Sequence, residues 1–146
     1  MQTSSKGIEL IKRHEGLRLT AYQCPAGIWT IGYGHTRDVE PEQRITAEQA
    51  AALLKIDLKE YERAVTDNVH IPLSQLQFDA LVSFCFNVGV VYFRESTMLK
   101  RINEEKHEEA MIALKWWDKA AGKPLKGLKR RRNEEVEMYL KGLKGY

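Results

Sequence analysis

The chain has 146 residues, of which 43% are hydrophobic and 29% charged, and its formal net charge is +3. This composition is ordinary for a globular domain with a real core and argues against a disordered or fibrous protein. No apolar run approaches the roughly 20 residues of a membrane-spanning helix, and none resembles the apolar segment of a signal peptide. We therefore expect a protein that is made and kept in the cytoplasm.

The two cysteines fit a reducing compartment, because a pair is too few for a disulfide framework. Cys85 lies in an apolar run and is expected to be a small core residue, not bridged to Cys24. The spacing of Cys24, His14 and His35 is unlike that of a structural zinc site, so we expect no metal and no cofactor.

A carboxylate closes the first predicted element. The spacing of apolar residues predicts a helix that opens near Ser4 or Ser5 and ends at Gly16. Glu15 falls on its apolar stripe in the last turn, where burial and the negative end of the helix dipole favour a protonated carboxyl. A general acid needs that form. A lone Glu more often ends a helix in water or in a salt bridge, so the following residues must support this interpretation.

A β-hairpin follows the first helix. Segments 19–22 and 28–35 read as strands, and the Pro-Ala-Gly sequence between them supplies a turn. The hairpin brings Cys24 and Thr30 near one another, at the mouth of the cleft that Glu15 faces. Glycines in the second strand leave the backbone bare, as where a bulky ligand approaches closely.

These residues carry a resemblance to a known family. The spacing of Glu15, Cys24 and Thr30, continuing as TIGYGHT, resembles the active-site signature of the phage-type lysozymes, which are the endolysins of bacteriophages. Further segments resemble the helical lobe of that family in the same order, among them QFDALVSF at 77–84, FNVG at 86–89 and RRR at 130–132. The resemblance covers nearly the whole chain.

The resemblance implies hydrolysis of the β-1,4 bond between N-acetylmuramic acid and N-acetylglucosamine in peptidoglycan, usually with inversion. By position, Glu15 is the acid that protonates the leaving oxygen, and Thr30 helps to hold the attacking water. The position between them is often Asp in the family and is Cys24 here. Inverting glycosidases ordinarily use two carboxyl groups. Three roles for Cys24 therefore stay open: a thiolate base, a neutral group that orients water, or a nucleophile giving a covalent sugar intermediate.

Other functions compete with the muramidase, which we favour. In a lytic transglycosylase, Glu15 would act as acid and then as base, and the 6-hydroxyl of muramic acid would attack to give a 1,6-anhydro product. A silent wall-binding or immunity-type module would keep the cleft without the chemistry, but the retention of Glu15 and Thr30 argues against it. A cysteine peptidase built on Cys24 and His35 lacks a third orienting group.

A long helix follows the hairpin. Thr46 and Gln49 form a capping-box pattern, and apolar residues keep helical spacing to about Asn68. Asp57 falls on the apolar stripe, where a buried carboxylate needs a partner. His35, at the end of the active-site strand, is the candidate, so we predict an Asp57–His35 pair that clamps the hairpin to the helix. A surface aspartate with a free histidine is the alternative.

The second lobe opens with another capping-box pattern, Ser74 with Gln77, and its first helix is apolar nearly all round until Gly89 ends it. Such a helix belongs at the centre of a lobe. Three later helices are expected at about 96–103, 108–117 and 125–140, with a loop at 122–124 and with Gly142 as the final stop.

Three residues of this lobe are candidate sugar contacts. The resemblance implies that Phe86 and Asn87 lie beside the cleft and that Ser96 begins the next helix across from them. Core packing or simple helix capping would explain each of the three equally well from sequence alone.

Cations gather near the C-terminus, in the run Lys126 to Arg132. Because Glu134, Glu135 and Glu137 follow at once, we expect a solvated, ion-paired helix and no nucleic-acid partner. A modest positive charge suits an anionic cell wall. In the family one arginine of this stretch packs behind the catalytic acid, and Arg131 matches best by position.

We therefore expect a single domain, residues 1–146, with a lysozyme-like α+β fold. It should have a small N-terminal lobe with the hairpin (about 1–45), a connecting helix (about 46–68) and a mainly helical lobe (about 69–146), with the cleft between the lobes. The resemblance implies a monomer that waits in the host cytoplasm and acts on peptidoglycan in the periplasm. Because it must pass the membrane through a separate lesion, it also implies a holin partner.

Overall fold

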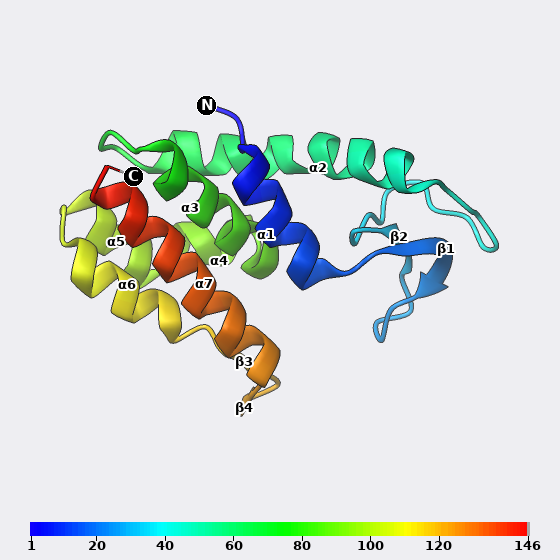
Figure 1. Cartoon of the computed structure of the whole chain (residues 1–146). Helices are drawn as coiled ribbons and strands as arrows, with labels where there is room; N and C mark the ends of the chain where they lie inside the picture. The colour runs from blue at the N-terminus through cyan, green and yellow to red at the C-terminus, as the bar shows by residue number, and fades with distance from the viewer. Residues whose placement is uncertain (146) are drawn as a thin grey trace.

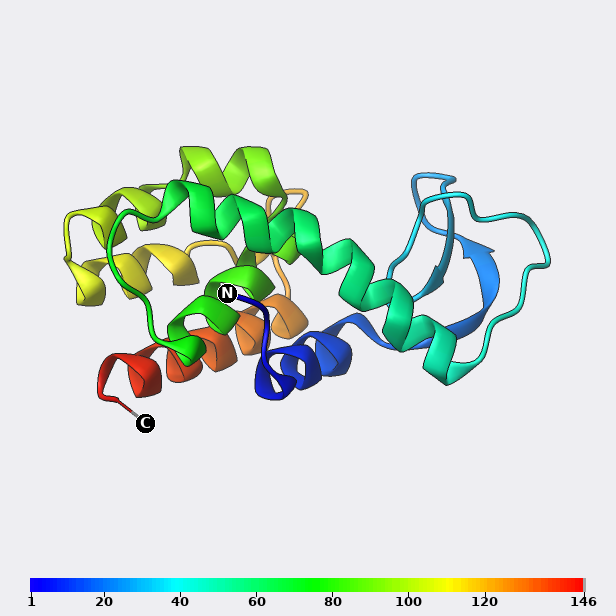
Figure 2. The ribbon, with the colours of Figure 1, turned by 90° about the horizontal axis from the view of Figure 1, so that it is seen from above.

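One long helix organises the computed structural model, which describes residues 1–145. Helix α2 (Ala47–Asn68) runs from a small β-hairpin lobe to a lobe of packed helices (Figures 1 and 2). Its start is fixed locally, because the Thr46 hydroxyl accepts the Gln49 N–H at 3.1 Å and the Gln49 side chain accepts the Thr46 N–H at 2.8 Å. The predicted capping box and connecting helix are confirmed.

The hairpin lobe is built on strands β1 (Arg18–Gln23) and β2 (Trp29–Gly32), which pair antiparallel. The second strand is shorter than the expected 28–35. It ends at Gly32 because the chain doubles back, and Ile31 and His35 exchange two backbone hydrogen bonds of 2.9 Å. This tight turn presents Gly34 and His35 toward the other lobe.

Helix α3 (Gln75–Val88) lies at the centre of the second lobe, as predicted, and its residues 77–85 are all buried. Around it pack helices from the rest of the lobe: α4 (Val90–Glu95), α5 (Thr97–Asn103), α6 (His107–Lys115) and α7 (Lys126–Leu143). Sequence reasoning did not foresee α4, and a two-residue strand pair, β3 (Lys119–Ala120) with β4 (Lys123–Pro124), replaces the expected loop. None of the described helices is long and apolar enough to cross a membrane.

Helix α1 (Ser5–Glu15) lies in the span expected for the N-terminal lobe, yet it packs on α3 and α7 of the helical lobe (Figure 1). The Ser4 N–H donates to the fully buried carboxylate of Asp79 at 3.0 Å, and the Thr3 N–H donates to Glu62 at 2.8 Å. The start of α1 is therefore anchored to α3 and α2. Its last residue, Glu15, lies where the chain leaves one lobe for the other.

The prediction that Gly142 ends the last helix was wrong. Helix α7 continues to Leu143, and Gly142 is a buried residue inside it. A Cβ at Gly142 would collide with the Ser74 Oγ and stand 2.8 Å from the Gln77 nitrogen. The glycine thus allows α7 to approach the first turn of α3, a tertiary reason that a pattern of helix stops does not reveal.

This close approach predicts that Gly142→Ala lowers the melting temperature. Overpacking of this kind costs about 1 to 3 kcal/mol, or about 3 to 10 °C for a chain of this length. Gly127→Ala in the same helix is the matched control, since nothing lies within 4 Å of its added Cβ. That change should stabilise by up to about 1 kcal/mol, because alanine favours helix. Thermal unfolding followed by circular dichroism measures both, and an equal gain in the two variants would contradict the packing account.

Candidate active site

The side chain of Glu15 is 21% exposed, and an arginine of the last helix contacts its carboxylate. Its Oε2 accepts a hydrogen bond of 2.6 Å from Nη1 of Arg131, a side chain only 4% exposed. Arg131 is the arginine that the resemblance singled out. The expectation of a protonated Glu15 rested on burial and the helix dipole alone and left this ion pair out.

The other oxygen of Glu15 faces the hairpin. A Cβ placed on Gly34 would lie 3.3 Å from Oε1, and the backbone of Gly34 has φ +84°, which side chains rarely adopt. A glycine is therefore needed for the turn after β2 to approach the acid. Glu15 is enclosed by α7 on one side and by the hairpin turn on the other.

Cys24 and Thr30 are brought together, as predicted, at the turn end of the hairpin. The Cys24 N–H donates to the Ile28 carbonyl at 2.9 Å, and the Thr30 hydroxyl donates to the same oxygen at 3.0 Å. Backbone hydrogen bonds from Ile28 and then Ala26 lower the pKa of the Cys24 thiol, with a smaller contribution from Thr30. More of this thiol is therefore ionised at neutral pH than of an ordinary cysteine.

The second cysteine has the opposite environment. Cys85 is fully buried in α3, and burial raises the pKa of its thiol to about 12. Both cysteines are free. Only Cys24 has the exposure and ionisation that thiol chemistry requires.

The predicted contact between His35 and Asp57 is present. Nδ1 of His35 lies 2.8 Å from Oδ2 of Asp57, and both side chains are mostly buried. The contact ties the turn after β2 to the middle of α2. Because the same turn also approaches Glu15, the position of the hairpin relative to the acid depends on this pair.

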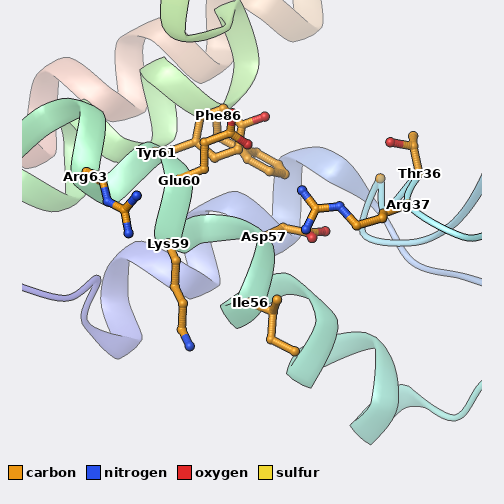
Figure 3. A pocket seen from close by; sticks show the side chains of 10 residues that line it. Thr36, Arg37, Ile56, Asp57, Lys59, Glu60, Tyr61, Arg63 and Phe86 are labelled. Carbon is orange, nitrogen blue, oxygen red and sulfur yellow. The ribbon is translucent and has the colours of Figure 1, made fainter.

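A cavity of about 370 Å³ opens between this turn and α2 (Figure 3). Gly34 lines it and also approaches Glu15, but Glu15 itself is not one of the residues that line the cavity. Tyr61 and Phe86 form its aromatic end. Their rings meet edge to face, with ring centroids 5.0 Å apart. Arg37 and Asp57 point toward one another across it. An elongated ligand with hydroxyl, amide and apolar faces suits this lining.

The other two candidate sugar contacts differ in their surroundings. Asn87 is exposed at the end of α3, beside Phe86, and its side-chain oxygen accepts a hydrogen bond of 2.9 Å from Arg132. Ser96 is buried, donates to the Phe93 carbonyl at 2.8 Å and accepts the Leu99 N–H at 3.1 Å. Its hydroxyl serves as the N-cap of α5.

The glutamates after the basic run do not pair with its exposed cations. Glu134 instead contacts Arg13 at 2.8 Å and His14 at 3.1 Å, both on α1, while Glu135 is fully buried. Burial lowers the pKa of His14 despite its contact with Glu134. Sequence analysis read these glutamates as partners of a solvated helix, because their contacts with α1 and α3 are tertiary. Lys126, Lys129 and Arg130 stay exposed, and none of them forms an ion pair within residues 1–145.

No metal site accompanies these residues: within the described chain, no three His, Cys, Asp or Glu side chains are grouped so as to hold an ion. The arrangement suits proton transfer by Glu15 and activation of a small nucleophile at Cys24 and Thr30.

A hairpin lobe and a helical lobe joined by a long helix, with a carboxylate at their junction, define the lysozyme-like α+β class. Comparison with solved structures agrees. The muramidase domain of SpmX from Asticaccaulis excentricus superposes with a TM-score of 0.91, at 48% identity, covering 95% of this chain and 97% of that one. The predicted fold class is confirmed.

Sequence comparison identifies the family within this fold class. The model of the phage lysozyme family matches residues 12–135. The endolysin of Acyrthosiphon pisum secondary endosymbiont phage 1 is 44% identical over 143 residues, which are 95% of this chain and 98% of that protein. The endolysin of Salmonella phage P22 is 45% identical, covering 93% of this chain and 97% of its own. The chain belongs to the phage lysozyme family.

The clamp between hairpin and helix predicts a loss of stability in Asp57→Asn. Removing the charge from a mostly buried pair should cost about 1 kcal/mol, or about 2 to 4 °C in melting temperature. Asp67→Asn, at an exposed position of the same helix, should lose nothing. Equal melting temperatures of Asp57→Asn and the parent protein at pH 5 to 6 would argue against the clamp.

Proposed function

We propose that the chain is an endolysin that hydrolyses the β-1,4 bond between N-acetylmuramic acid and N-acetylglucosamine in peptidoglycan. One observation carries the proposal: the Glu15 carboxyl lies between Arg131 and the bare backbone of Gly34, beside a cavity formed by both lobes. A glycan strand lying in this cavity would pass the acid. Membership of the phage lysozyme family supports the same reaction.

In the proposed reaction Glu15 is the general acid. It gives its proton to the leaving oxygen as the bond to the anomeric carbon breaks, and it becomes a carboxylate. Arg131, 2.6 Å away, stabilises the anion as it forms.

Cys24 and Thr30 are proposed to act on the water that attacks from the opposite face of the sugar. The lowering of the Cys24 pKa by backbone hydrogen bonds supports a thiolate that accepts a proton from this water. The Thr30 hydroxyl already donates to the Ile28 carbonyl, so its oxygen accepts a hydrogen bond from the water and orients it. Phe86 and Asn87 are proposed sugar contacts, and Ser96 is proposed to support them through the start of α5.

A lytic transglycosylase is the second candidate, favoured by one feature. The second position holds a thiol where an inverting hydrolase ordinarily has a carboxylate, and a transglycosylase needs no base for water. In that reaction the muramic acid 6-hydroxyl attacks after Glu15 has changed from acid to base. A module that binds the cell wall without catalysing a reaction is the third candidate.

The biological setting follows from the endolysin proposal. The enzyme would be a monomer held in the host cytoplasm until a holin opens the membrane, and it would then degrade peptidoglycan in the periplasm and release phage progeny. Exposed Lys126, Lys129 and Arg130 would favour contact with an anionic wall. Nucleic acid and stable membrane insertion have no part in the proposal.

Mass spectrometry of fragments released from purified Gram-negative peptidoglycan tests the proposal. The parent protein should release muropeptides with reducing ends, and Glu15→Gln should lower the rate by at least about a hundredfold, because the acid is lost. Cys24→Ser should lower the rate strongly, because a serine hydroxyl cannot serve as the proposed base, and a high residual rate would mean that the thiol only orients water. Cys85→Ala, at the buried cysteine, is the matched control and should stay active.

Three other results would contradict the muramidase proposal. Products with 1,6-anhydro ends would make the protein a lytic transglycosylase. Full activity of Glu15→Gln would remove Glu15 from the mechanism. Binding to the wall without release by any variant would mean that the protein is not an enzyme.

A further inference from the structure

A fully buried glutamate lies behind the proposed catalytic acid. Glu135, on α7, has no exposed surface. Its Oε2 accepts hydrogen bonds from the Ser83 hydroxyl at 2.6 Å, from Nε of Arg131 at 3.3 Å and from Nη2 of Arg132 at 3.3 Å. Its Oε1 lies 2.9 Å from Nε of Arg132. One carboxylate thus holds two neighbouring arginines.

The two arginines extend to two different parts of the proposed site. Nη1 of Arg131 reaches Glu15 at 2.6 Å, and Nη2 of Arg132 reaches the side-chain oxygen of Asn87 at 2.9 Å. Arg131 also donates to the Ser83 carbonyl at 3.2 Å, which fixes its guanidinium against α3. Glu135 is therefore linked through one side chain to the acid and through another to a proposed sugar contact.

Stability does not account for this cluster. Burial raises the pKa of Glu135 and lowers that of Arg132, so each charge is costly where it lies. Nη1 of Arg132 is buried with no hydrogen-bond partner in residues 1–145, although the guanidinium lies 5.0 Å from the centre of the Phe84 ring. Well-packed apolar side chains often stabilise such a site equally well or better. The charges therefore call for a functional explanation.

We propose that Glu135 is a positioning residue that controls both Arg131 at the acid and Arg132 at Asn87. The inference rests on the proposed function and deepens it. Glu135 touches neither the substrate nor Glu15; it acts through the two arginines.

The charges of the cluster explain why a buried anion is useful. Glu15, Glu135, Arg131 and Arg132 together are neutral when all four are ionised. When Glu15 takes up the proton that it must donate, Glu135 is the one carboxylate left to balance two buried cations. Without that charge both arginines would act on Glu15 alone and favour its ionised form. Glu135 therefore supplies the balancing charge for the two arginines while Glu15 carries its proton.

Other titratable groups surround Glu15 and stay unchanged in the test. His14 is its neighbour on α1 and is paired with Glu134 of α7, and Tyr61 of α2 is close enough to be influenced by its charge. From the hairpin side, the nearest pair is His35 with Asp57. A change confined to Glu135 therefore reports on the two arginines.

The test is the pH profile of kcat/KM for Glu135→Gln, which keeps the shape of the side chain and removes its charge. The alkaline limb, where the acid loses its proton, should move down by about one pH unit, a roughly tenfold loss on that limb. KM should also rise, because Arg132 no longer fixes Asn87. Glu137→Gln removes an exposed carboxylate of the same helix and should leave the profile and KM unchanged. Asn87→Ala should raise KM without moving the limb.

A folded Glu135→Gln with lower activity but an unmoved alkaline limb would show a merely structural role and overturn the proposal. If Glu135→Gln does not fold, Ser83→Ala decides, because it keeps every charge and removes the 2.6 Å hydrogen bond to Glu135 together with the 3.4 Å hydrogen bond that the same hydroxyl accepts from Nη2 of Arg131. We expect kcat per folded molecule to fall several-fold, and unchanged kcat and KM would overturn the proposal. Failure of the muramidase proposal would look different: the parent protein would release 1,6-anhydro products or no fragments at all, or Glu15→Gln would stay fully active.

Discussion

The ion pair between Arg131 and Glu15 is the contact on which the rest of the site depends. It joins the end of α1 to α7, two helices far apart in sequence, at the point where the chain passes from the helical lobe to the hairpin. The acid therefore belongs to the rigid helical lobe, while Cys24 and Thr30 belong to the hairpin. Catalysis in the proposed reaction therefore requires the two lobes to keep a fixed position relative to one another.

Two features fix the position of the hairpin relative to the helical lobe. The turn at Gly34 approaches Glu15 closely, and the next residue, His35, contacts Asp57 on the helix that spans both lobes. The hairpin is thus tied to α2 at the point where it meets the acid. Behind the acid, Glu135 and Ser83 fix the arginines against α3. Backbone turns and buried charges, more than the apolar core, determine how the reactive groups face one another.

Sequence reasoning succeeded where structure is decided locally. The capping box at Thr46 and Gln49 marked the start of α2 correctly, and a carboxylate on an apolar stripe pointed to the Asp57–His35 contact. The predictions failed where contacts between segments far apart in the sequence decide the structure. Gly142 ends no helix because it accommodates α3, and Glu135, spaced for solvated pairing along α7, turns inward to Ser83. The i to i+4 spacing of Arg131 and Glu135 was visible in the sequence, but its burial was not.

The account predicts that water, oriented by Cys24 and Thr30, attacks in a single step on the face opposite Glu15. The most direct test is proton NMR of the first product released from soluble, uncross-linked glycan strands, recorded before the new reducing end mutarotates. The predicted product is the α-anomer, since one displacement inverts the β-linkage. A β-anomer formed first would contradict the account, because retention requires a covalent or protein-stabilised intermediate and would make Cys24 the candidate nucleophile.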